Sequence, residues 1–202
     1  MEIPEASFSL RDAGEPPSEA ARPYWIYCGG AREGATWIDP EDVVDYDEIA
    51  RTGAAEYVRD VLGPGLAIST NPASYGLVGM PTWNWVDGWD GQPIAVPTIS
   101  AFGDSVDITL RFQQARWDFG DGTPTQSGDL GRVYPVESTV QHNYTVRSTS
   151  RAEPDGTYTV AATATISATY RLNGGPEIAV DPPLTTTATA PVIIRQAQAV
   201  LS

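Results

Sequence analysis

Few residues in this chain of 202 have side chains suited to acid–base or nucleophilic chemistry. His142 is the sole histidine, and it alternates with apolar residues over 140–146, as on the buried face of a β-strand. A histidine in that setting is typical of a hydrogen-bonded core position, and no nucleophile motif surrounds it. We therefore predict no catalytic residue at His142. Cys28, the sole cysteine, fits either a buried thiol or an intermolecular attachment point.

Paired carboxylates are the other source of catalysis to consider. Asp87 and Asp90 lie in one short segment, and Asp104 and Asp107 lie in the next. Glycoside hydrolysis needs two carboxyl groups at a defined separation. A secreted hydrolase built on such a pair is therefore one alternative function.

The segment Trp117–Gly122, W-D-F-G-D-G, holds two further carboxylates at Asp118 and Asp121. Carboxylate oxygens suit Ca²⁺, so calcium is the one cofactor to consider. The spacing lacks the alternating ligands of an EF-hand loop, whereas Asp followed by Gly is typical of a tight turn. We predict a structural turn and no cofactor or metal.

Three tryptophans are the candidate binding residues: Trp83, Trp85 and Trp89. In a strand, Trp83 and Trp85 would share one face. Flat aromatic rings stack on sugar rings or on a protein partner, but they also fill cores. The alternative is that these rings fill the interior or pack against an N-terminal helix.

Composition excludes several functions. All 12 basic residues are Arg, against 26 acidic residues, for a net charge of −14. Without Lys there is no P-loop, no Schiff base and no lysine isopeptide, so any assembly would be noncovalent. The acidic charge disfavours nucleic acid. There is no apolar run of 18 residues to span a membrane, and the first residues lack signal-peptide features.

The acidic residues are concentrated in the first 65 residues, which carry 14 of them. Pro, Ser, Ala and Glu dominate the start and predict a flexible arm over 1–38. Asp39-Pro40 is a favourable helix start, and Gly63-Pro64-Gly65 is a favourable end, so we predict a helix over about 40–62. The predicted domains are an acidic extension, 1–65, and a β-domain, 66–202.

After residue 65 the hydrophobic pattern becomes that of antiparallel strands. It is clearest in Tyr158–Leu172, where apolar residues alternate with Thr, Ser and Arg. Fifteen residues are long for one flat strand, so we expect a bend or a bulge. Several such segments separated by turn residues predict a β-sandwich.

Three motifs, in this order, resemble the PKD (polycystic kidney disease) repeat, an immunoglobulin-like β-sandwich found in secreted bacterial proteins. The first is W-D-F-G-D-G, the second is H-x-Y and the third is G-x-Y-x-V. The matching residues are Trp117, Asp118, Phe119, Gly120, Asp121, Gly122, His142, Tyr144, Gly156, Tyr158 and Val160. The segments 123–138 and 147–155 are long for a compact repeat, so we interpret them as inserted loops.

The resemblance implies an extracellular or cell-surface location, with a signal peptide removed beforehand, and an adhesive or spacer role without catalysis. We therefore predict a secreted interaction module that binds protein or cell-envelope glycan. Two alternatives stay open. One is the hydrolase; the other is an accessory subunit of an extracellular filament or secretion apparatus, docked through residues 1–38.

Overall fold

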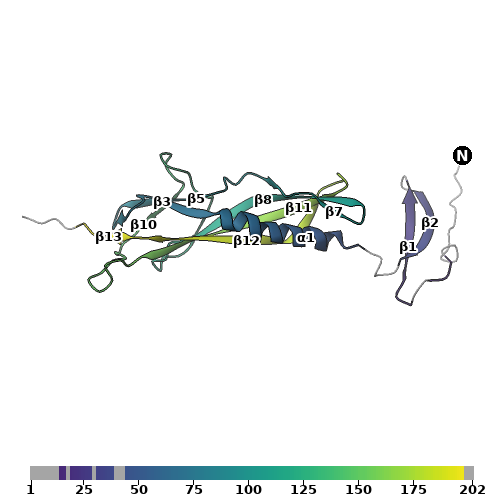
Figure 1. The fold of residues 1–202 in the computed structure, drawn as a ribbon, viewed down its shortest axis with the longest axis horizontal. Helices are drawn as coiled ribbons and strands as arrows, with labels where there is room; N and C mark the ends of the chain where they lie inside the picture. Colours follow the sequence, from purple (N-terminus) through teal and green to yellow (C-terminus); the bar gives the residue numbers. More distant parts are fainter. Residues whose placement is uncertain (1–13, 17–18, 29–30, 39–43, 198–202) are drawn as a thin grey trace, which may run out of the picture. The chain divides into compact units, whose positions relative to one another are not determined.

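The computed structural model describes residues 14–16, 19–28, 31–38 and 44–197 (Figure 1). The chain divides into two compact units, Met1–Asp45 and Tyr46–Ser202. It is mainly β, with antiparallel sheets and one short helix. No helix of the described part is long and apolar enough to cross a membrane.

The first unit contains a β-hairpin, in which β1 (Arg22–Cys28) pairs antiparallel with β2 (Ala31–Ile38). The sequence predicted a flexible arm over 1–38, whereas the structure describes these two segments as paired strands. Tyr, Trp and Ile side chains in 24–27 favour a strand, and Gly29-Gly30 is a hairpin signal in the sequence. The prediction for residues 1–13 and for the Cys28 side chain lies outside the described residues.

The helix belongs to the second unit, whereas the sequence predicted a boundary at residue 65. Helix α1 (Tyr46–Tyr57) continues into the π-turn η3 (Val58–Leu62) and the last turn α2 (Gly63–Gly65). Residues 44 and 45 are not helical, and the predicted cap at Asp39 lies outside the described residues. The helical segment groups with the second unit because its buried side packs on the β-sheet. The residues of that side are Ala50, Ala54, Val58 and Leu62.

Two sheets and a short parallel pair make up the rest of this unit. The larger sheet has three long strands: β8 (Asp104–Asp118), β11 (Tyr158–Leu172) and β12 (Ile178–Val192). Three short strands pair with β8: β6 (Ile94–Ala95), β7 (Ile99–Ala101) and β9 (Gln126–Gly128). The smaller sheet has the order β10 (Val140–Asn143), β5 (Pro81–Asp87), β3 (Ala67–Asn71). Finally, β13 (Ile194–Arg195) pairs in parallel with β4 (Gly76–Leu77).

Strand β11 follows the predicted alternation along its length. Its inward residues are all buried: Val160, Ala162, Ala164, Ile166, Ala168 and Tyr170. The expected bend or bulge does not divide β11, which runs unbroken over Tyr158–Leu172. The extra residues lie in the neighbouring strands, at Gln113 of β8 and at 181–183 of β12. Because of the extra residue at Gln113, the inward positions of β8 change from even numbers (106, 108 and 110) to odd numbers (115 and 117).

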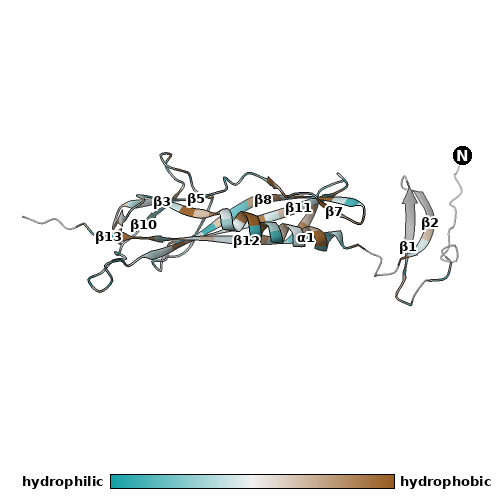
Figure 2. Cartoon of the chain, viewed as in Figure 1, coloured by the Kyte–Doolittle hydropathy of each residue, from teal (hydrophilic) through white to brown (hydrophobic). Residues whose placement is uncertain are grey.

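One hydrophobic core joins the two sheets and the helix. Helix α1 contacts β8, β11 and β12, and β3 of the smaller sheet contacts β11 and β12. Apolar residues accordingly appear on α1 and on the neighbouring strands (Figure 2). The helix passes close to the sheet at Gly53, where a Cβ atom would collide with Ile99. The arrangement is consistent with a β-sandwich whose long sheet is partly covered by a helix.

Candidate functional site

The W-D-F-G-D-G segment forms the end of β8 and the turn after it. Asp118 Oδ1 accepts a hydrogen bond from the Gly120 amide at 2.9 Å. Asp121 Oδ1 accepts from the amide and the hydroxyl of Thr123, at 3.1 and 2.6 Å. Gly120 has φ of 73°, and a Cβ atom there would lie 2.5 Å from the carbonyl oxygen of Thr159. Both carboxylates thus hold backbone of their own turn, and Gly120 allows close contact with β11.

The aromatic residues of the three motifs form one buried stack. The Phe119 ring lies parallel to the His142 imidazole, with centroids 4.1 Å apart, and the Trp117 ring stacks on Phe119 at 6.4 Å. Tyr144 meets His142 edge-on at 4.6 Å and stacks on Tyr158 at 5.2 Å. The motif residues, distant in sequence, are therefore gathered in the core.

The third motif adds backbone contacts beside this stack. Gly156 accepts a hydrogen bond from the Ser148 hydroxyl at 2.9 Å, and a Cβ atom on Gly156 would collide with the Ser148 carbonyl. Val160 is completely buried. Gly156 thus brings the loop 147–155 against the start of β11.

His142 and Asp121 form a buried pair. His142 Nε2 lies 2.8 Å from Asp121 Oδ2, and the two side chains are 6% and 7% exposed. Burial raises the pKa of Asp121, but the hydrogen bonds from Thr123 and His142 outweigh it and hold that pKa below its usual value. Burial also raises the pKa of the Tyr144 hydroxyl. These groups are shielded from solvent, and their hydrogen bonds serve the turn and the stack.

The three tryptophans occupy different environments. Trp85 is 8% exposed and donates to Asp87 Oδ1 at 2.9 Å. Trp89 is equally buried, donates to the Gln92 carbonyl at 2.8 Å and packs edge-to-face on Phe112. Trp83 is half-buried, and its ring lies 6.4 Å from that of Tyr134 at a tilt of 41°. Of these three residues, Trp83 is the one that is not buried.

Trp83 lies at the centre of a row across the smaller sheet. It is paired with Asn71 of β3 on one side and with Gln141 of β10 on the other. Gln141 Nε2 donates to Glu137 Oε1 at 2.8 Å and to the Ser138 carbonyl at 3.0 Å.

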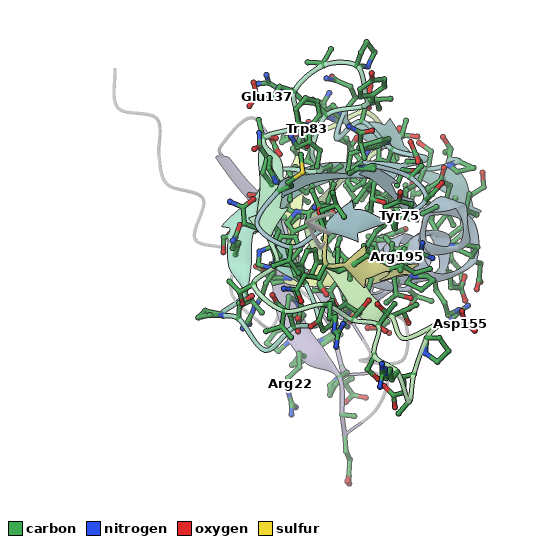
Figure 3. All side chains as sticks on the ribbon, turned by 90° about the vertical axis from the view of Figure 1, so that its left-hand side faces the viewer. Arg22, Tyr75, Trp83, Glu137, Asp155 and Arg195 are labelled. Carbon is green, nitrogen blue, oxygen red and sulfur yellow. The ribbon has the colours of Figure 1, made fainter. Side chains whose placement is uncertain are left out.

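A hollow of about 450 Å³ adjoins this row, and its lining includes Asn71, Tyr75, Met80 and Pro81. We call the combined region the Trp83 surface; it consists of Asn71, Tyr75, Met80, Pro81, Trp83, Tyr134, Glu137 and Gln141. Figure 3 looks onto this end of the unit, with Trp83 close to Glu137 and with Tyr75 beside Arg195. The Arg195 guanidinium lies 4.7 Å from the centre of the Tyr75 ring.

Sequence reasoning identified Trp83 in this surface but not its neighbours. Cross-strand register brings Asn71 and Gln141 beside Trp83. Glu137 joins them through the hydrogen bond from Gln141. Gln141 carries one weak signal, because it is a polar position in the alternating segment 140–146. Tyr134 lies in the segment that the sequence predicted to be an inserted loop.

The carboxylates proposed for hydrolysis fall into separate places. Asp87 and Asp90 line one hollow of about 570 Å³ with Trp89. Asp87 accepts hydrogen bonds from Ser69 and Trp85, and Asp90 accepts from the Gln92 amide.

Asp104 and Asp107 do not line that hollow. Asp104 accepts from Tyr46 and Asn173, and these two hydrogen bonds lower its pKa. Asp107 accepts from Thr98 at 2.6 Å. Within the described residues, no group of three or more His, Cys, Asp or Glu side chains is placed to hold a metal ion.

Comparisons with protein-family models, with curated proteins and with solved structures give no match to this chain. Support for a function therefore comes from the sequence motifs and from the geometry of the described residues.

Proposed function

We propose that this chain is a noncatalytic interaction module, with an immunoglobulin-like β-sandwich of PKD type, that acts outside the cell or at its surface. The observation that carries the proposal is that the histidine–carboxylate pair is buried, whereas several aromatic residues are not. His142 and Asp121 are buried in a turn-and-stack network, while Tyr75 and Tyr134 are exposed and Trp83 is only half-buried. Exposed aromatic side chains of this kind are typical of binding surfaces.

The test is the retention of fluorescently labelled chain on the cells that produce it. We expect saturable retention, competed by unlabelled chain. We also expect the variant Phe102→Ala to be retained equally, because Phe102 lies in the turn between β7 and β8, outside the Trp83 surface. Absence of saturable retention would contradict an interaction module.

One observation favours the hydrolase as a second candidate, because Asp87 and Asp90 line the same hollow. Its test is turnover of glycoside substrates by the chain and by Asp87→Asn and Asp90→Asn. Turnover that both substitutions abolish would establish the hydrolase and overturn the noncatalytic proposal. We expect no such turnover, since hydrogen bonds from Ser69, Trp85 and Gln92 already engage both carboxylates.

A further inference from the structure

We infer that the Trp83 surface binds a neutral polysaccharide, with a pyranose ring stacked on the exposed part of the Trp83 indole. This inference deepens the proposed function and rests on it. It commits the module to one class of ligand and to one place on the molecule.

The row across the smaller sheet has the chemistry that a sugar ring requires. An indole lies in the middle, with the amides of Asn71 and Gln141 on the two neighbouring strands. Adjacent strands are about 4.8 Å apart, so the amides flank the ring within reach of the hydroxyl groups at the edge of a stacked sugar. Sugar hydroxyls donate and accept hydrogen bonds, as amides do.

The two amides differ in what they offer. The Asn71 side chain makes no hydrogen bond to the described residues, so its donor and its acceptor are both available. The Gln141 nitrogen is held by Glu137 and by the Ser138 carbonyl, and this fixes the orientation of its amide. The row across the smaller sheet thus has one amide without a hydrogen bond to the described part of the chain, that of Asn71, and one amide held in place by two hydrogen bonds, that of Gln141.

The extent of the surface favours a polymer over a monosaccharide. Tyr134, which is 56% exposed, lies beside Trp83 on one side. On the other side, the hollow next to Asn71 leads to Tyr75, which is 43% exposed. Three aromatic rings along one surface can contact more than one sugar unit of an extended chain.

Charge restricts the polymer to a neutral one. The chain carries a net charge of −14, and Glu137 lies in the Trp83 surface, whereas Arg195 lies over the Tyr75 ring at its edge. Beside Trp83, polysaccharides rich in uronic acid or sulfate would meet repulsion from the net charge and from Glu137. Polymers of β-linked glucose or N-acetylglucosamine are neutral and present flat apolar ring faces.

The experiment measures binding of the full chain to cellohexaose and chitohexaose by calorimetry, and its sedimentation with insoluble cellulose and chitin. We expect binding to at least one of these four probes. Trp83→Ala should weaken it about tenfold, and Tyr134→Ala should weaken it less. The matched control is Phe102→Ala, which removes an aromatic ring that is 82% exposed at the turn between β7 and β8.

Unfolding curves keep this test interpretable. If Trp83→Ala alters the unfolding midpoint, the double variant Asn71→Ala, Tyr134→Ala takes its place, and the same loss of binding is expected. Failure of the wild-type chain to bind any of the four probes would overturn the inference. Binding that survives both sets of substitutions would overturn it as well.

The inference and the proposed function can fail separately. If the chain binds the cells that produce it after periodate oxidation of their glycans, but not after protease treatment, the module binds protein. The polysaccharide inference then fails and the proposed function stands. If the chain binds neither treated nor untreated cells, the proposed function fails as well.

Discussion

At the residue scale, His142 illustrates how a conspicuous side chain can serve the fold. Its ring lies between the parallel face of Phe119 and the edge of Tyr144, and its Nε2 lies 2.8 Å from Asp121. Asp121 also accepts two hydrogen bonds from Thr123, so one carboxylate ties the turn after β8 to strand β10. Removing either partner therefore affects both elements.

The first prediction concerns this pair. Asp121→Ala should lower the free energy of unfolding by about 3 kcal/mol, because it leaves the buried His142 ring and the partly buried Thr123 hydroxyl without their acceptor. Urea denaturation measures the change. Glu137→Ala, at an exposed carboxylate, is the control and should change it by less than about 0.5 kcal/mol. Equal effects of the two substitutions would contradict the structural role of Asp121.

The second prediction follows from the lowered pKa of Asp121. A carboxyl group whose pKa is lower in the folded state stabilises the fold above its unfolded pKa, near 3.8, and this stabilisation is lost as the pH falls through the folded pKa. Wild-type stability should therefore fall below about pH 4, and Asp121→Asn should reduce the slope there. Parallel curves of unfolding free energy against pH for the two proteins would contradict this.

The third prediction separates the two glycines of the turn. Gly120→Ala places a methyl group against the Thr159 carbonyl and also holds Ala at φ of 73°. Gly122→Ala holds Ala at φ of 81° with open space around the new methyl group. We expect Gly122→Ala to cost about 1 kcal/mol and Gly120→Ala clearly more. Thermal unfolding of both variants measures the difference, and equal losses would exclude the close contact with β11.

At the element scale, helix α1 is part of the core of the β-unit. Ala50 and Ala54 are completely buried, and the Tyr170 hydroxyl of β11 donates to Asp47 at 2.7 Å. The hydroxyl of Tyr46 likewise donates to Asp104 at the start of β8. The helix covers apolar residues of the long sheet that the smaller sheet leaves uncovered.

The fourth prediction compares two truncations. The truncated chain 46–202 should unfold cooperatively, at the same midpoint as the larger unit within the full chain. The shorter chain 66–202 should lack that cooperative transition, because it has lost the helix. Calorimetry and near-UV circular dichroism measure both. A cooperative transition in 66–202 at the same midpoint would mean that the predicted boundary at residue 65 is the better one.

The strands show what sequence patterns could and could not predict. In β11 the alternation of apolar residues with Thr and Ser indicated the buried face, because one face is solvated and the other packed. For β5 the sequence left open whether Trp83 and Trp85 face the core or a partner; in the structure Thr82 and Asn84 are completely buried, while Trp83 is half-buried. Tertiary packing decides which face of such a strand points inward. The row of Asn71, Trp83 and Gln141 depends on strand register, which local sequence does not contain.

At the scale of the whole molecule, the chain combines two separate units with an uneven distribution of charge. The hairpin unit ends at residue 45, and the acidic residues are concentrated in the first 65 residues. In the larger unit, the motif residues pack inside and the Trp83 surface lies at one end (Figure 3). We infer that the fold supports the Trp83 surface, and that this surface provides the binding function.

The fifth prediction tests this account most directly, by the retention of Trp83→Ala on the cells that produce the chain. Its retention is compared with that of wild type and of Phe102→Ala at matched thermal stability. Our account predicts that Trp83→Ala loses most of its retention, while Phe102→Ala binds as the wild type does. Equal retention of all three proteins would contradict it.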